Sequence, residues 1–164
     1  ELTPSLSSKI IIGHVKDGIK LAKEYRLPPA IANFIPMHHG TSKIDFFYNK
    51  ALEIFDNDFS KINEDDFKYP GPKPNTKETG LLMICEAVEA AVRSLKNPTL
   101  TKIESMADKI IQKRLQEGQL DNCPLTISDL NKIKGNVKGK YGMMSVFKGI
   151  YHLRIEYPNQ EKSQ

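Results

Sequence analysis

The stretch TKETGLLMICEAVEAAVRSL, residues 76–95, decides the fold of this chain. Its apolar side chains recur at the spacing of one helix face, and Thr76, followed by Thr79, is typical of a helix N-terminus. Small residues such as Ala87 allow neighbouring helices to approach closely. We therefore predict a central helix over these residues that ends before Pro98.

The pattern on both sides of this stretch is also helical. We find no run of alternating apolar and polar residues with hairpin turns, so the predicted fold class is all-α, with about six helices. The other helices are predicted at residues 5–26, 29–38, 42–55, 101–115 and from 127, after the cap Thr126, to about 154 as a kinked helix or two pieces. Within residues 42–55, the expected buried stripe is Ile44, Phe47, Tyr48, Ala51 and Ile54.

Residues 56–75, between two of these helices, are acidic and then rich in proline. The run YPGPKP, residues 69–74, holds three prolines, which exclude a regular helix and favour a rigid, extended loop. No internal repeat or second core is visible. Residues 1–158 are therefore predicted to belong to one domain, with residues 159–164 as a frayed polar tail.

The composition is that of a globular protein, with 39% hydrophobic and 27% charged residues among 164. Lys and Arg number 24 against 20 Asp and Glu, and this net charge of +4 does not demand a polymeric nucleic acid as partner. No apolar run is long enough to cross a bilayer. Cys85 and Cys123 have no metal-motif spacing and are expected to be reduced thiols. Because residue 1 is Glu and no signal peptide follows, we expect a piece of a longer chain.

Three of the four histidines lie in the first quarter of the chain. His14 falls in the middle of the first predicted helix, and His38 and His39 end the second, which folds back across a proline turn. Gly40 supplies the helix end at which two adjacent imidazoles can turn toward one ion. Three neutral imidazoles suit iron, manganese or zinc. The alternative is a core histidine and a surface pair at a helix C-terminus.

Two carboxylates of the central helix, Glu86 and Glu89, lie three residues apart among apolar neighbours. A carboxylate close to a buried face needs a cation. Arg93, four residues after Glu89, can satisfy that residue as an ion pair. Glu86 has no local basic partner and is the better candidate for a metal ligand.

The loop after residue 67 combines rigid backbone with Tyr69, Lys68 and Lys73. An aromatic face and two cations can hold a base and a phosphate. On composition alone, a stiff connector is the other interpretation.

Seven strings of the sequence form an ordered set: GHVKDGIKLAKEYRLP (13–28), HHGT (38–41), FFYNKA (46–51), FKYPGPKPNTKET (67–79), EAVEAAVRSL (86–95), EGQLDNCPLT (117–126) and IYHLRIEYP (150–158). In this order they resemble the intracellular HD domain of PgpH-type membrane-anchored phosphodiesterases. The resemblance runs through nearly the whole chain, and YPGPKP together with HHGT is its most specific part.

This resemblance implies an all-helical HD-domain bundle that hydrolyses the bacterial second messenger cyclic di-AMP to pApA with two metals, iron or manganese. His14, His38 and His39 match metal ligands of the family, and Glu86 stands where the family has an Asp ligand. Tyr48, Lys68, Tyr69 and Lys73 are the expected substrate-binding residues. His152 matches no ligand and is expected to be structural.

The family's His-Asp pair is absent from this sequence, and we expect it to lie upstream of residue 1. Residues 1–158 would then be the C-terminal larger part of one HD domain, with at most one metal bound and little activity. The alternatives are a cyclic-dinucleotide-binding module with a degenerate metal site and a remnant without metal. The resemblance further implies the cytoplasmic domain of a bacterial inner-membrane protein. The piece itself is expected to make no membrane contact and to dimerise through an exposed apolar face.

Overall fold

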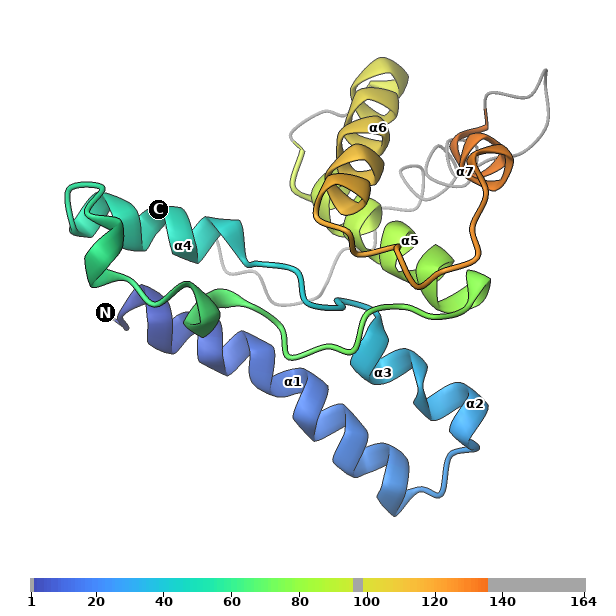
Figure 1. The fold of residues 1–164 in the computed structure, drawn as a ribbon, viewed down its shortest axis with the longest axis horizontal. Coiled ribbons are helices and arrows are strands. Elements are labelled where there is room, and N and C mark those ends of the chain that lie inside the picture. The colour runs from blue at the N-terminus through green and yellow to red at the C-terminus, as the bar shows by residue number, and fades with distance from the viewer. Residues whose placement is uncertain (1, 96–98, 136–164) are drawn as a thin grey trace, which may run out of the picture.

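A computed structural model of the protein describes residues 2–95 and 99–135, and these residues are helical without a regular strand (Figure 1). The longer helices are α1 (Pro4–Glu24), α4 (Asp45–Ile54), α5 (Lys77–Arg93), α6 (Leu100–Gln116) and α7 (Ile127–Lys134). Two short helices, α2 (Pro29–Ala32) and α3 (Phe34–Met37), and two 3₁₀ turns, η1 (Phe59–Lys61) and η2 (Glu64–Phe67), complete the order. The predicted all-α class is confirmed. None of the helices described is both long and apolar enough to cross a membrane.

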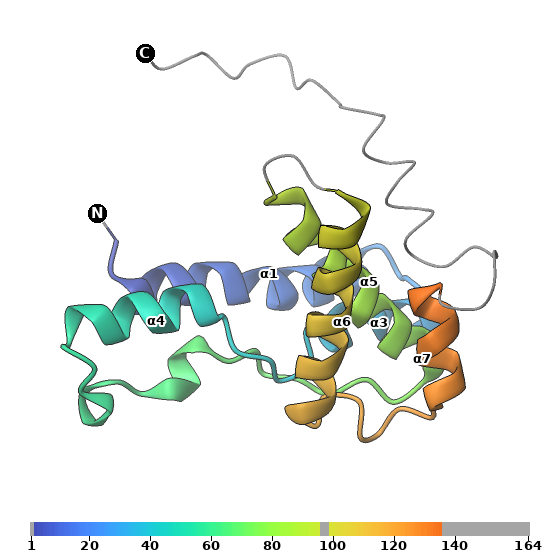
Figure 2. The same cartoon turned by 90° about the horizontal axis from the view of Figure 1, so that it is seen from above.

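The helices form two groups that meet at α3. On one side, α1 packs against α3, α4 and η2, and on the other α5 packs against α6, which also contacts α7. Figure 2 shows α1 and α4 running alongside one another, and in Figure 1 both lie apart from the crossed helices α5 and α6. Contacts between α3 and α5 join the groups. The segment just after α3 therefore lies between them.

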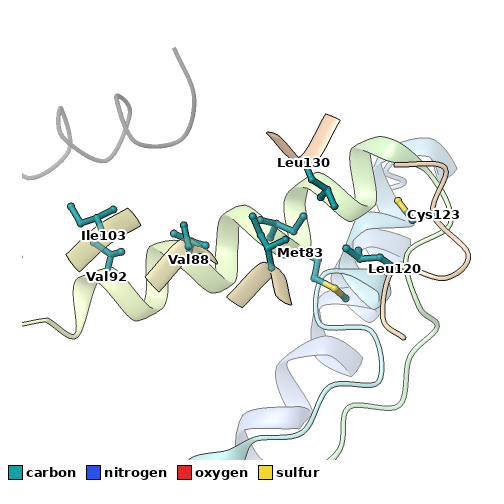
Figure 3. Packing of buried hydrophobic residues seen from close by; sticks show 10 residues of the cluster. Met83, Val88, Val92, Ile103, Leu120, Cys123 and Leu130 are labelled. Carbon is teal, nitrogen blue, oxygen red and sulfur yellow. The ribbon is translucent and has the colours of Figure 1, made fainter. Parts of the chain in front are cut away.

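The main core is built around α5, as the sequence predicts for its central helix (Figure 3). Met83, Ile84, Val88 and Val92 of α5 are 0–1% exposed. They pack with Ile103, Ala107 and Ile111 of α6 and with Leu120, Cys123 and Leu130 beyond it. Burial of this apolar surface is the main source of stability for the second group of helices.

The threonine caps fix where these helices begin. The Thr76 side chain accepts from the Thr79 amide, and the Thr79 hydroxyl in turn accepts from the Thr76 amide, 3.1 Å away. Thr126 and Asp129 form the same reciprocal arrangement at α7. Helix α7 ends at Gly135, which has φ +86°. The predicted continuation of this helix to about residue 154 lies outside the described residues.

Three predictions about the first group of helices are wrong. Helix α4 begins at Asp45 because the residues before it pair with another segment, with the Ile44 amide donating to the Phe67 carbonyl over 2.8 Å. Ile54, expected in the buried stripe, is 58% exposed, since it lies in the last turn of α4, while Leu52 is buried. The helix predicted at residues 29–38 is divided at Asn33 into α2 and α3.

Candidate metal centre

His14 projects from the middle of α1 with one ring nitrogen already used. Its neighbour Val15 is buried, whereas His14 itself is exposed. The His14 Nδ1 lies 2.6 Å from the Ile11 carbonyl oxygen. Because a carbonyl only accepts, Nδ1 carries the proton, and Nε2 is left with a free lone pair.

His38 repeats this arrangement at the end of α3. Its Nδ1 donates to the Ile35 carbonyl over 2.6 Å, so its Nε2 also has a free lone pair. Met37, the buried last residue of α3, anchors the chain just before it. Gly40 turns the chain immediately afterwards with φ +54°. The turn allows the adjacent His38 and His39 to face the same point.

The three imidazoles converge as the sequence suggests. The His14 and His38 Nε2 atoms are 3.1 Å apart, and one ligand atom from each of His14, His38 and His39 lies within 4.8 Å of the others. Two unprotonated nitrogens facing each other repel unless a cation lies between them. Two ligands of one tetrahedral ion, at metal–nitrogen distances of about 2.0–2.1 Å, stand about 3.3 Å apart. The donor set and its spacing therefore fit a transition metal.

His39 is held neutral. Burial, with the neighbouring imidazoles His38 and His14 and the charge of Arg114, lowers the pKa of His39 from 6.5 to about 3. The Tyr69 ring stacks on it, with centroids 4.1 Å apart and 21° between the planes. A neutral imidazole is the form that binds a metal ion.

Glu86 lies against His39. Its Oε2 is 3.6 Å from the His39 Nδ1, and because His39 is neutral this contact is not an ion pair at pH 7. Burial raises the pKa of Glu86. Its position suits either a ligand or an outer carboxylate that orients His39. Glu89 has its Oε2 3.6 Å from the Arg93 guanidinium, as the ion-pair interpretation predicts.

Gln119 fixes the turn that follows the histidines. The Thr41 amide donates to the Gln119 Oε1 over 2.9 Å, and the Gln119 Nε2 donates to the Thr41 Oγ1 over 3.1 Å. Gln119 is 3% exposed and comes from the segment after α6. These bonds tie the second helical group to the histidine turn.

The four predicted substrate-binding residues lie in different surroundings. Tyr69 is 8% exposed and belongs to the histidine cluster. The Lys73 ammonium lies beside Gly118, 3.5 Å from where a Cβ on that glycine would stand. Tyr48 packs against Phe67, and the Lys68 ammonium is 3.3 Å from carboxylates of Glu64 and Asp65. Lys68 therefore has local acidic partners.

Arg114 is a site residue that the sequence analysis does not identify. It lies in the last turn of α6, where the pattern indicates only a favourable charge at a helix C-terminus. Its side chain is mostly buried, and its charge acts on His39, Tyr69 and Glu86. No local signal reveals this, because the residues it faces are remote in sequence.

Comparisons with known proteins identify the fold. No family model matches the chain. It is 41% identical over 162 residues to the cyclic-di-AMP phosphodiesterase PgpH of Bacillus subtilis and 39% identical over 160 residues to PgpH of Listeria monocytogenes. These matches cover 99% and 98% of the chain but 21% of each relative, so the chain spans about a fifth of their length.

Two solved structures of the L. monocytogenes PgpH HD domain resemble the chain. The form in complex with cyclic di-AMP has a TM-score of 0.80 and 40% identity, covering 95% of the chain and 68% of the solved domain. The other form has a TM-score of 0.79 and 38% identity, covering 92% and 66%. By fold and sequence together, the chain belongs to the PgpH family of HD-domain proteins.

Proposed function

We propose that this chain is part of a metal-dependent phosphodiesterase domain that acts on cyclic di-AMP. The observation that carries the proposal is the pair of facing Nε2 atoms of His14 and His38, with His39 beside them, because this spacing and donor set fit one transition-metal ion. The substrate is supported by relatives named cyclic-di-AMP phosphodiesterases and by a similar HD domain solved with that ligand.

The proposed ligands of one iron or manganese ion are the three imidazoles. Glu86, in place of the family's Asp, is proposed as a carboxylate ligand of the second ion of the complete domain. A bound divalent ion acts as a Lewis acid toward phosphoryl oxygens and makes water a better nucleophile near neutral pH. The chain holds His14 and His38 in the tautomer with a free Nε2. It also keeps His39 neutral by burial.

Hydrolysis adds one water molecule across one phosphodiester linkage of the cyclic dinucleotide. One P–O bond breaks, and the product is linear pApA with a terminal phosphate and a free hydroxyl. Lys73, which has no acidic partner among the described residues, is proposed to balance phosphate charge. Tyr69 and Tyr48 are proposed to contact the base or ribose, and Lys68 to contribute a charge that Glu64 and Asp65 partly neutralise.

We propose that these 164 residues alone turn over little substrate. The described residues bring together one cluster of metal-ligating side chains, and the sequence contains no His-Asp pair. A two-metal site needs further ligands, and about a third of the solved HD domain has no counterpart in the match, which covers 68% of it. The remaining ligands are proposed to come from other parts of the parent protein, with this domain on the cytoplasmic side of a bacterial membrane.

Helix α1 carries exposed apolar side chains that indicate a protein partner. Leu2, just before α1, and Leu6, Ile10 and Leu21 within it are 45–59% exposed. We propose that the rest of the HD domain covers this apolar face in the parent protein and that the isolated chain dimerises through it. Sedimentation of native chain and Ile10→Glu tests this, since the variant is expected to be monomeric.

The experiment that tests the function is a hydrolysis assay on the full-length protein with manganese. We expect conversion of cyclic di-AMP to pApA, and loss of turnover in His39→Ala. Binding without cleavage by the metal-loaded native protein would contradict the enzyme and support a nucleotide-binding module.

The position of Glu86 is the observation that supports the second candidate function, a nucleotide-binding module without hydrolysis. Its carboxylate is close enough to His39 to act as an outer partner without contacting the ion. If Glu86 is a metal ligand of an enzyme, Glu86→Gln is expected to cut turnover sharply. Glu86→Asp is expected to retain turnover. In a binding module, Glu86→Gln would leave nucleotide affinity unchanged.

A further inference from the structure

Arg114 is a mostly buried guanidinium for which the described residues supply too few acceptors. Its side chain is 14% exposed, and its Nη1 donates to the Glu117 Oε2 over 3.2 Å. The buried Nε makes no hydrogen bond within the described part of the chain. Glu117 is also shared, since the Lys113 ammonium lies 3.6 Å from its other carboxylate oxygen. Buried charged donors are normally paired, so the lack of an acceptor for the Arg114 Nε needs an explanation.

The charge of Arg114 acts on three residues around the histidine cluster. Burial is the main cause of the pKa shifts of His39, Tyr69 and Glu86, and the charge of Arg114 contributes to each of them. These three residues come from the turn after α3, the proline-rich loop and α5.

Gln119 connects the backbone of Arg114 to the histidine turn. The backbone amide of Gln119 donates to the backbone carbonyl of Arg114 over 2.9 Å. The Gln119 side chain accepts from the backbone amide of Thr41, two residues after His39. The last turn of α6 is thereby fixed in position relative to the cluster. The Arg114 side chain therefore starts from a backbone position that is held beside the histidine turn.

The chemistry of a guanidinium selects the class of ligand. It is planar, remains charged, and presents parallel N–H donors that match the oxygens of a phosphate. Three neutral imidazoles and a divalent ion would leave positive charge beside Arg114, so an anion between them is favoured. Resting on the proposed function, we infer that Arg114 binds a non-bridging phosphate oxygen of the cyclic dinucleotide.

This role predicts opposite effects on stability and on binding. A structural arginine stabilises the fold, and its loss lowers the melting temperature. An arginine kept for a ligand is an incompletely paired buried charge in the free protein, so its replacement leaves stability unchanged or higher. Glu117 keeps Lys113 as a partner in either case.

The test compares Arg114→Gln with Lys109→Gln, an exposed residue of the same helix that loses the same charge. Full-length protein loaded with manganese is titrated with cyclic di-AMP and, separately, with inorganic phosphate, and its melting temperature and metal content are measured. We expect Arg114→Gln to weaken cyclic di-AMP binding at least about tenfold, the effect of one charge-assisted hydrogen bond. Its metal content and melting temperature should not fall, and Lys109→Gln should bind like the native protein.

Titration with both cyclic di-AMP and inorganic phosphate distinguishes failure of this inference from failure of the proposed function. If cyclic di-AMP does not bind but inorganic phosphate binds in an Arg114-dependent way, Arg114 is a phosphate ligand and the proposed substrate is wrong. Equal cyclic di-AMP affinity in native protein and Arg114→Gln overturns the inference and leaves the function in place. Loss of binding together with a lower melting temperature also overturns it, because Arg114 would then be structural, and so does failure to bind both ligands.

Discussion

Replacing Gly40 with alanine should destabilise the protein, whereas the same replacement at Gly13 should stabilise it. Gly40 has φ +54°, and a Cβ there would lie 2.5 Å from the Gln119 Oε1 and 2.7 Å from the Met83 Cε. Gly13 lies within α1 and would meet no atom within 4 Å. The two variants carry one chemical change in opposite structural settings.

The magnitude follows from three contributions. A non-glycine residue in the left-handed region costs about 1–2 kcal/mol. Relieving the contact with Gln119 disturbs its two hydrogen bonds to Thr41, worth about 0.5–1.5 kcal/mol each. Alanine returns about 0.4–1 kcal/mol by restricting the unfolded chain. Gly40→Ala should therefore lower the free energy of unfolding by about 2–4 kcal/mol, and Gly13→Ala should raise it by about 0.5–1 kcal/mol.

Urea denaturation followed by circular dichroism measures both values. Manganese affinity is measured alongside, because displacement of Gly40 also moves His39. We expect weaker metal binding in Gly40→Ala and native affinity in Gly13→Ala. A Gly40→Ala protein as stable as the native one would refute the described packing of the histidine turn.

Two further variants test the contacts around this core. Gln119→Ala should lower the free energy of unfolding by about 1–3 kcal/mol, because the Thr41 amide loses its acceptor, while Gln116→Ala at the exposed end of α6 should change little in urea melts. The Lys77 ammonium, with the Thr126 cap, holds the pKa of Asp129 below its usual value, so its stabilising effect is present above about pH 4 and is lost as the pH falls. Thermal melts should show Asp129→Asn less stable than the native protein at pH 7 and the two converging toward pH 2; a gap independent of pH would exclude this ionic contribution.

The fold could be predicted where its signals are local. The Thr76 and Thr79 pair marks the start of α5, and its spacing of apolar residues marks the buried face. The pattern predicts that Ile54 is buried, but periodicity identifies one side of a helix and not where its covering neighbour ends. It also predicts an earlier start for α4, because the competing Ile44–Phe67 pairing spans a loop and leaves no local signal.

The candidate metal centre also has parts that a local sequence pattern predicts and parts that it does not. Convergence of the histidines could be predicted, since a proline turn returns the chain and Gly40 ends the short helix beside them. The roles of Gln119 and Arg114 could not, because both residues lie near the end of α6, remote in sequence from the histidine turn. The Gln119–Thr41 bonds join residues 78 positions apart, and no local pattern encodes that distance.

The most direct test of the central claim is the metal content of the purified protein after reconstitution with manganese or iron. His14, His38 and His39 are the claimed ligands, so His38→Ala should lose about one equivalent of metal, and His152→Ala, a histidine without an assigned ligand role, should retain it. Circular dichroism checks that both variants remain folded. Unchanged metal content in a folded His38→Ala protein would contradict the claim that the three histidines hold the ion.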